Sequence, residues 1–172
     1  QQTASVGQLP LPALAQGSFP ADLLSVANAK SYTANLPELQ KNAAAGGYFS
    51  VSRLDEDGVF RRVPLVEIYD GALYETLSLA LTRLVLNEPT VQLGVEEDAS
   101  GYKAVEWLQL GERRIPVDDG VAALVPYRGL EGSFPYISAT DVLQGKAQGE
   151  VLNGAIVLVG TTAAGLKDLR VT

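Results

Sequence analysis

A short, fully apolar run near the carboxyl end constrains the fold of this chain more than any other segment. Residues 155–159 read Ala-Ile-Val-Leu-Val, and Gly160, Thr161 and Thr162 follow them directly. A run of this length and composition predicts a strand that is buried on both faces. We expect it to lie in the interior of a sheet, with a polar loop at its carboxyl end. In α/β proteins, ligands commonly bind at such a loop.

Two helices are predicted in the first half of the chain. Pro37 suits the first position of a helix, Glu38 favours its positive end, and the Gly46-Gly47 pair can end it after Ala45. The second helix has Pro89 just beyond its end. Its apolar residues recur at helical spacing and form one stripe: Leu73, Leu77, Ala80, Leu81, Leu84 and Val85. A third, brief helix is predicted from Ser138, as its cap, to Leu143.

Strands are predicted on both sides of several turn signals. A β-hairpin over residues 48–54 and 59–68 would turn at Asp57-Gly58, and Asp119-Gly120 is a second turn pair; both glycines suit a positive φ. Gly111-Glu112 is a third turn. The remaining predicted strands are 91–95, 103–110, 113–117 and 121–127. Together these elements predict the mixed α/β class: a mixed β-sheet with β-hairpins and packed helices in a single domain, in which residues 1–35 form an irregular lead-in.

Composition narrows the function. The 172 residues carry a net charge of −7 with a pI near 4.6, which argues against nucleic acid and anionic lipid as partners. The chain has no histidine and no cysteine, so the commonest general base, the commonest metal ligand and the thiol nucleophile are missing. No apolar run approaches the roughly 20 residues that span a bilayer. These absences weigh against most hydrolase classes, although catalysis by carboxylates or lysine stays open, and we expect no cofactor and no metal.

The loop after the apolar run comes close to a phosphate-binding motif. That motif needs two glycines with four residues between them, then a lysine and a hydroxyl residue. Here Leu166 stands where the lysine belongs, and Asp168 follows Lys167 where a hydroxyl is needed. A strand end capped by threonine hydroxyls and a small-ligand pocket are the alternatives for this loop.

Other charged groups have a structural and a functional interpretation each. Asp55-Glu56-Asp57-Gly58 resembles the start of a calcium loop, but Pro64 stands where the bidentate glutamate belongs, so a solvated turn is favoured. Arg61 and Arg62 would form exposed ion pairs with acids or bind an anion. Asp118-Asp119 would form a turn. Arg128 would clamp a carboxylate such as Asp168 or contact a ligand.

Five segments in order resemble the CHASE-two family, the cyclase and histidine-kinase associated sensory extracellular domains of type two. They are 36–39, 55–65, 115–120 with 125–129, 134–145 and 152–172. The family usually has an additional amino-terminal strand and helix and continues toward membrane helices. The resemblance therefore implies a fragment whose sensory core spans residues 36–172.

The resemblance also implies a function. The chain would be the non-catalytic, extracytoplasmic sensory domain of a bacterial inner-membrane receptor, tethered by membrane helices in the full-length protein. It would signal to a nucleotide cyclase, a kinase or a cyclic-dinucleotide enzyme. A small-molecule ligand and a homodimer are implied as partners. We expect the ligand beyond residue 159, at Thr161 and Thr162, with Arg128, Arg61 and Asp168 as charged neighbours.

Two other functions stay open on sequence grounds. A cytoplasmic α/β enzyme or nucleotide-binding domain would use the Gly160 loop. A protein-interaction module would use a sheet edge or an apolar face. Apolar spans flanking this chain in the full-length protein would favour the sensor.

Overall fold

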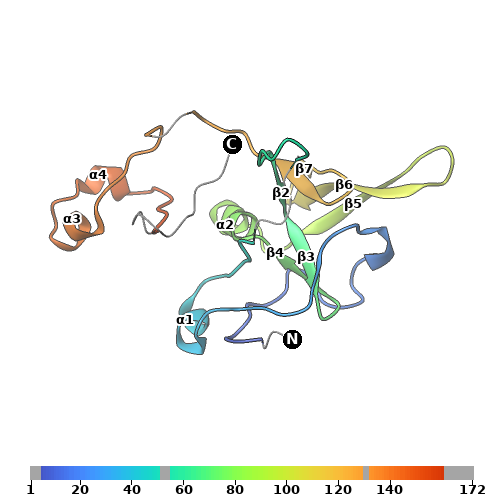
Figure 1. Cartoon of the computed structure of the whole chain (residues 1–172), viewed down its shortest axis with the longest axis horizontal. Coiled ribbons are helices and arrows are strands. Elements are labelled where there is room, and N and C mark those ends of the chain that lie inside the picture. Colours follow the sequence, from blue (N-terminus) through green and yellow to red (C-terminus); the bar gives the residue numbers. More distant parts are fainter. Residues whose placement is uncertain (1–4, 51–54, 130–131, 161–172) are drawn as a thin grey trace. The chain divides into compact units, whose positions relative to one another are not determined.

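The structure is a computed structural model that describes residues 5–50, 55–129 and 132–160. The chain divides into two compact units, Gln1–Val125 and Pro126–Thr172. In the described residues, the first unit holds three small sheets with helices α1 and α2, and the second holds the short helices α3 and α4 (Figure 1). The mixed α/β class predicted from the sequence is therefore confirmed.

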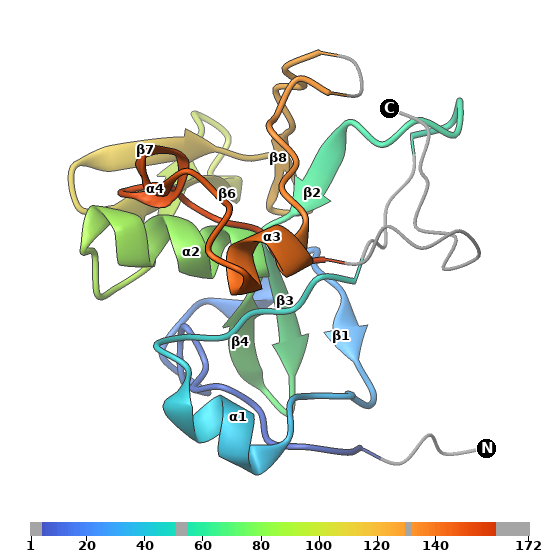
Figure 2. The ribbon, with the colours of Figure 1, turned by 90° about the vertical axis from the view of Figure 1, so that its left-hand side faces the viewer.

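One sheet of the first unit is mixed. Its central strand β3 (Val66–Tyr69) pairs in parallel with β1 (Asn28–Ala29) and antiparallel with β4 (Ala72–Glu75), as Figure 2 shows. The β3-β4 hairpin turns at Asp70 and Gly71, whose φ angles are 49° and 75°. Positive φ at both central residues is the geometry that follows the right-handed twist of the strands. Residues 1–35 contribute to this sheet through β1.

The other two sheets are antiparallel. Strands β2 (Arg62–Pro64) and β8 (Ala122–Leu124) form one pair. Strands β5 (Gln92–Glu97), β6 (Lys103–Leu110) and β7 (Arg113–Pro116) form the third sheet, with β6 in the centre. The predicted strand 103–110 is confirmed with the same bounds, and Gly111-Glu112 forms the turn that joins it to β7.

A single apolar cluster joins the elements of the first unit. It combines residues of α2 with residues of the sheets and of the segments between them, because each strand buries the alternate side chains that face inward. Its buried members are Leu65, Val66, Leu73, Leu79, Val91, Val105, Leu108, Leu110 and Val121.

The helices of the first unit begin later or end earlier than predicted. After the 3-10 turn η1 (Ala21–Leu23), α1 (Pro37–Asn42) begins at Pro37 as predicted but ends before the two glycines. Helix α2 (Leu77–Leu86) begins four residues after Leu73. The prediction for Leu73 is wrong: it lies in β4, fully buried in the core. Thr76 caps α2 by accepting a hydrogen bond from the backbone N–H of Leu79, which separates the strand from the helix.

The hairpin predicted around Asp57-Gly58 is confirmed only at its turn. Gly58 has a φ of 80°, and the backbone N–H of Asp55 donates to the carbonyl of Val59. The flanking pairing is different from the prediction, because β2 pairs with β8 and Tyr48 forms a bridge with Thr76. Residues 51–54 of the predicted first strand lie outside the described residues.

At the second predicted turn, Asp119-Gly120, the residue with positive φ is not the one that was predicted. Positive φ is found at Val121, at 51°, and not at Gly120. This conformation is unfavourable for a β-branched residue. Asp118 stabilises it, because its Oδ1 accepts hydrogen bonds from the backbone N–H groups of Gly120 and Ala122 at 3.0 and 2.9 Å. The turn-forming role predicted for this acidic pair is confirmed for Asp118.

The second unit contains α3 (Ala139–Leu143) and α4 (Gly149–Leu152). Ser138 caps α3 as predicted by accepting from the backbone N–H of Thr140, whereas α4 was not predicted. None of the described residues of this unit is buried. In the described part of the chain, no helix has the length and apolarity needed to cross a membrane.

The buried strand predicted over residues 155–159 is wrong. This segment has no strand structure, and Leu158 and Val159 are 84% and 93% exposed. A strand requires a neighbouring backbone to receive its hydrogen bonds, and apolar composition does not supply one. The apolar composition of this run was therefore not sufficient evidence for a strand, because it does not identify a neighbouring strand to pair with.

Candidate ligand-binding site

The site predicted from the sequence is described only in part. Thr161, Thr162 and Asp168 lie outside the described residues. Arg61 belongs to the first unit and Arg128 to the second, where Arg128 is exposed. A ligand-binding role for these five residues stays a prediction, although the strand that was expected to position them is not formed.

Arg61 and Arg62 form the ion pairs that were one of their two interpretations. The Arg61 guanidinium lies 3.2 Å from Asp55 and 2.8 Å from Asp57. The guanidinium of Arg62 lies 2.7 Å from Asp55 and 3.6 Å from Asp118. The hydrogen bond from Arg61 lowers the pKa of the Asp57 carboxyl, and the backbone N–H of Val59 adds to this effect. The Arg61 guanidinium is exposed, whereas Arg62 and Asp55 are partly buried, and together these pairs connect the Gly58 turn to β2.

A buried ion pair lies on the core side of the first sheet. Glu75, at the end of β4, is only 4% exposed and accepts two hydrogen bonds from the Arg83 guanidinium of α2, one of them from Nε at 2.7 Å. Nη1 of Arg83 also donates to the carbonyls of Glu88 and Pro89. Such bidentate, charge-assisted contacts hold α2 against the sheet and satisfy the buried carboxylate. This arrangement is structural.

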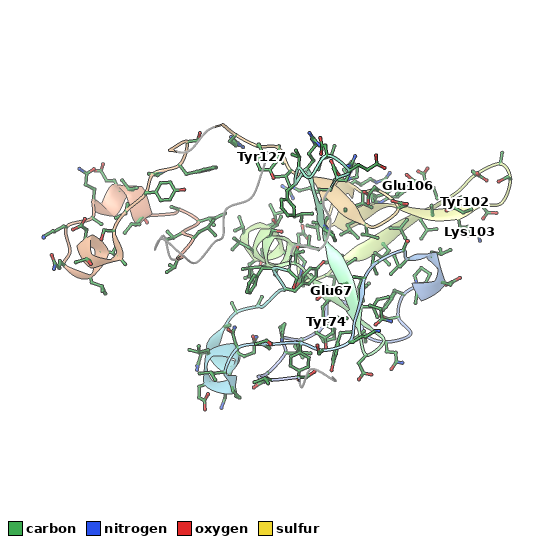
Figure 3. The ribbon with its side chains drawn as sticks, viewed as in Figure 1. Glu67, Tyr74, Tyr102, Lys103, Glu106 and Tyr127 are labelled. Atoms are coloured by element: carbon green, nitrogen blue, oxygen red, sulfur yellow. The ribbon has the colours of Figure 1, made fainter. Side chains whose placement is uncertain are left out.

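A pocket of about 270 Å³ lies beside the same sheet. Side chains alternate along a strand, so Glu67 of β3 points away from the core that Val66 enters. In register, Glu67 is opposite Tyr74 of β4, and Figure 3 labels both. The pocket is lined by residues 25–27, which precede β1, by Tyr48, Pro64, Val66 and Glu67, and by Asp119 and Gly120 of the turn before β8.

Glu67 is the unusual group of this pocket. It is half-buried, and burial raises the pKa of its carboxyl above the usual value of 4.5. In the described part of the chain its carboxylate has no hydrogen-bond or ion-pair partner. The carboxylate is thus partly removed from water without the compensation that Glu75 receives.

Tyr48 forms another wall of the pocket. Its hydroxyl donates a hydrogen bond of 2.9 Å to the carbonyl oxygen of Pro64. Burial raises the pKa of the Tyr48 phenol well above its usual range, and the negative charge of Glu67 adds to the rise. Tyr48 therefore stays protonated and neutral at physiological pH. Backbone hydrogen bonds with Glu75 and Leu77 hold it beside the end of β4.

A second pocket, of about 420 Å³, lies in the second unit between residues 135 and 151. Its charged side chains, Asp141 and Lys146, have opposite signs, and no residue that lines it is buried. The charges of these two side chains balance, so the pocket favours neither a cationic nor an anionic ligand. The Glu67 pocket is the better-defined candidate.

A family model for the CHASE2 domain matches residues 7–172, nearly the whole chain. The chain belongs to the CHASE2 family. CHASE2 domains are sensory, extracellular domains of receptors and not catalytic ones. The resemblance noted in the sequence is therefore confirmed. The searches of curated proteins and of solved structures gave no match.

Tyr48 and Glu67 both lie within the residues that the CHASE2 model matches. Neither was predicted from the sequence as a site residue. Their proximity depends on the register of β3 with β4 and on the bridge between Tyr48 and Thr76. The one local signal was the Asp70-Gly71 pair, which fixes the hairpin that places Glu67 on the outer face.

Proposed function

We propose that this chain is the extracytoplasmic input domain of a bacterial transmembrane receptor of the inner membrane. It passes a signal to a cytoplasmic output domain, which is a nucleotide cyclase, a kinase or a cyclic-dinucleotide enzyme. The observation that carries the proposal is the match of the CHASE2 family model over residues 7–172. The domain itself performs no catalysis in this proposal.

The proposal assigns the domain a binding role. A small molecule changes the receptor only if it binds two arrangements of the domain, or of a homodimer, with different affinity. The pocket around Glu67 supports this role because it offers a partly desolvated charge to a ligand.

The location can be tested by cysteine labelling, because the chain contains no cysteine. The test uses a full-length receptor from which all other cysteines have been removed. Glu112, which is exposed in the β6-β7 turn, is replaced by cysteine in this parent (Glu112→Cys). We expect a membrane-impermeant maleimide to label this variant in intact spheroplasts, whereas the cysteine-free parent stays unlabelled. Labelling that requires lysis of the inner membrane would place the domain in the cytoplasm and refute the proposal.

A further inference from the structure

The Glu67 pocket combines an unpartnered carboxylate with apolar walls. The carboxylate is half-buried at the centre of the outer sheet face, where no described residue donates to it. A partly desolvated charge without a partner destabilises a fold. A ligand that pairs with the carboxylate would remove this penalty when it binds.

The charge of the lining defines the sign of that ligand. Two carboxylates, those of Glu67 and Asp119, line the pocket, and no lysine or arginine does. The other titratable group of the lining, Tyr48, is neutral, as is Tyr74 across the strand pair. An anion would meet two like charges here, whereas a cation would meet a carboxylate that lacks a partner.

The remaining walls define the size and character of the ligand. Val26 and Pro64 present apolar surface beside Glu67. The volume of about 270 Å³ lies just below the range of roughly 300–1,000 Å³ that holds drug-sized molecules. A hard metal ion is a poor match, because it needs six or more oxygen ligands and the described residues contain no group of three acidic side chains suited to a metal.

We propose that this pocket binds a small organic cation, a primary ammonium on a short apolar body, through the carboxylate of Glu67. The ammonium donates hydrogen bonds to the carboxylate, and the apolar body packs against Val26 and Pro64. The Tyr48 hydroxyl is already engaged with the Pro64 carbonyl and closes one wall. The inference deepens the proposed sensory function and rests on it for its biological meaning, but the binding chemistry stands by itself.

The test is an NMR titration of the ¹⁵N-labelled chain at pH 7 with n-butylammonium chloride. n-Butanol and sodium butyrate, which match the probe in size but are neutral or anionic, serve as control ligands. We expect saturable shifts of the backbone amides of Ala27, Glu67 and Gly120 with the ammonium. The control ligands should cause no shift, even at about 10-fold above the butylammonium concentration that saturates the pocket. Absence of a saturable shift with butylammonium, or equal shifts with butanol, would overturn the proposal.

Two variants locate the binding group. Glu67→Gln should weaken the binding of butylammonium at least about tenfold, because a charge-assisted hydrogen bond is lost. Glu106→Gln makes the same change at an exposed position on β6 and should leave the affinity within about twofold. Undiminished binding by Glu67→Gln would refute the role of this carboxylate.

A measurement on the unmodified chain decides the matter if Glu67→Gln does not fold. Protonation removes the charge of Glu67, so affinity for butylammonium should fall as the pH is lowered from 7 through the raised pKa of this carboxyl. Constant affinity over that range would contradict the proposal. The maleimide experiment on Glu112→Cys tests location alone, so the two proposals can fail independently.

Discussion

Glu75 and Glu67 lie on neighbouring strands of one sheet but on opposite faces. Glu75 is opposite Val66 in the β3-β4 register and enters the core, whereas Glu67 is opposite Tyr74 on the outer face. The core-facing glutamate is 4% exposed and has two hydrogen bonds from Arg83, while the outer one is half-buried without a partner. The fold therefore neutralises the carboxylate that is fully buried and leaves the half-buried one uncompensated.

The difference separates a structural role from a binding role. A buried carboxylate must be compensated within the fold, because water is excluded and no ligand can reach it. A carboxylate at a pocket can be left uncompensated at a smaller cost, since solvent screens it until a ligand arrives. Substitutions on the two faces should accordingly differ in size and, at the two glutamates, in sign.

The largest effect is expected on the core face, at Arg83. Arg83→Ala leaves the Glu75 carboxylate buried without its partner and frees the carbonyls of Glu88 and Pro89. Removing one member of a buried ion pair costs about 3–5 kcal/mol. Urea unfolding measures this loss of unfolding free energy. A loss below about 1 kcal/mol would mean that the fold does not depend on the pair.

The next prediction compares the stability cost of alanine substitutions at two adjacent residues of β4. Leu73→Ala removes a fully buried side chain from the core and should cost about 2–5 kcal/mol. Tyr74→Ala acts on the outer face, where the ring contacts Tyr69 edge to face at 6.3 Å. Its cost should be at least about 1 kcal/mol smaller than that of Leu73→Ala in the same urea experiment. Equal losses would contradict the division into a core face and an outer face.

A still smaller effect is expected at the wall of the pocket. Tyr48→Phe removes the hydroxyl that donates to the Pro64 carbonyl and keeps the ring. The loss of one such hydrogen bond should reduce the stability by about 0.5–1.5 kcal/mol, as measured by thermal unfolding. Tyr136→Phe, at an exposed position of the second unit, is the matched control and should have no measurable effect. Equal shifts in both variants would show that the bond to Pro64 does not stabilise the pocket wall.

The sequence predicted the regular part of the fold well where a pattern and its turn agree. Strand β6 was predicted with its full bounds, because its run is rich in apolar residues and the Gly111 turn ends it. The start of α2 was placed too early because Leu73 happens to fit the helical spacing. The preceding Asp70-Gly71 pair and the Thr76 cap are local signals that would have placed the boundary correctly.

Features that depend on distant partners were not predictable in this way. Residues 155–159 have the composition of a buried strand, yet they are exposed and form no strand in the structure. The pocket combines Glu67 with Tyr48 and Asp119, which come from three separate parts of the sequence. No spacing within one segment indicates such a combination, since it depends on strand register and on the isolated bridge at Tyr48.

The central claim is that the fold compensates Glu75 and leaves Glu67 for a ligand. Urea unfolding of Glu75→Gln and Glu67→Gln at pH 7 tests it directly, because both variants exchange the same carboxylate for an amide. Glu75→Gln should destabilise by about 3 kcal/mol, since it leaves the Arg83 cation without its counter-charge.

Glu67→Gln should instead stabilise, by less than about 1 kcal/mol because solvent screens this half-exposed group. Folding raises the pKa of Glu67, so the wild-type chain is favoured below the usual value of 4.5 and loses that advantage as the pH rises through the raised pKa. The gain of Glu67→Gln should therefore be full at pH 7 and vanish below pH 4.5. Destabilisation by both variants at pH 7 would contradict the account, because it would show that Glu67, like Glu75, is held by the fold.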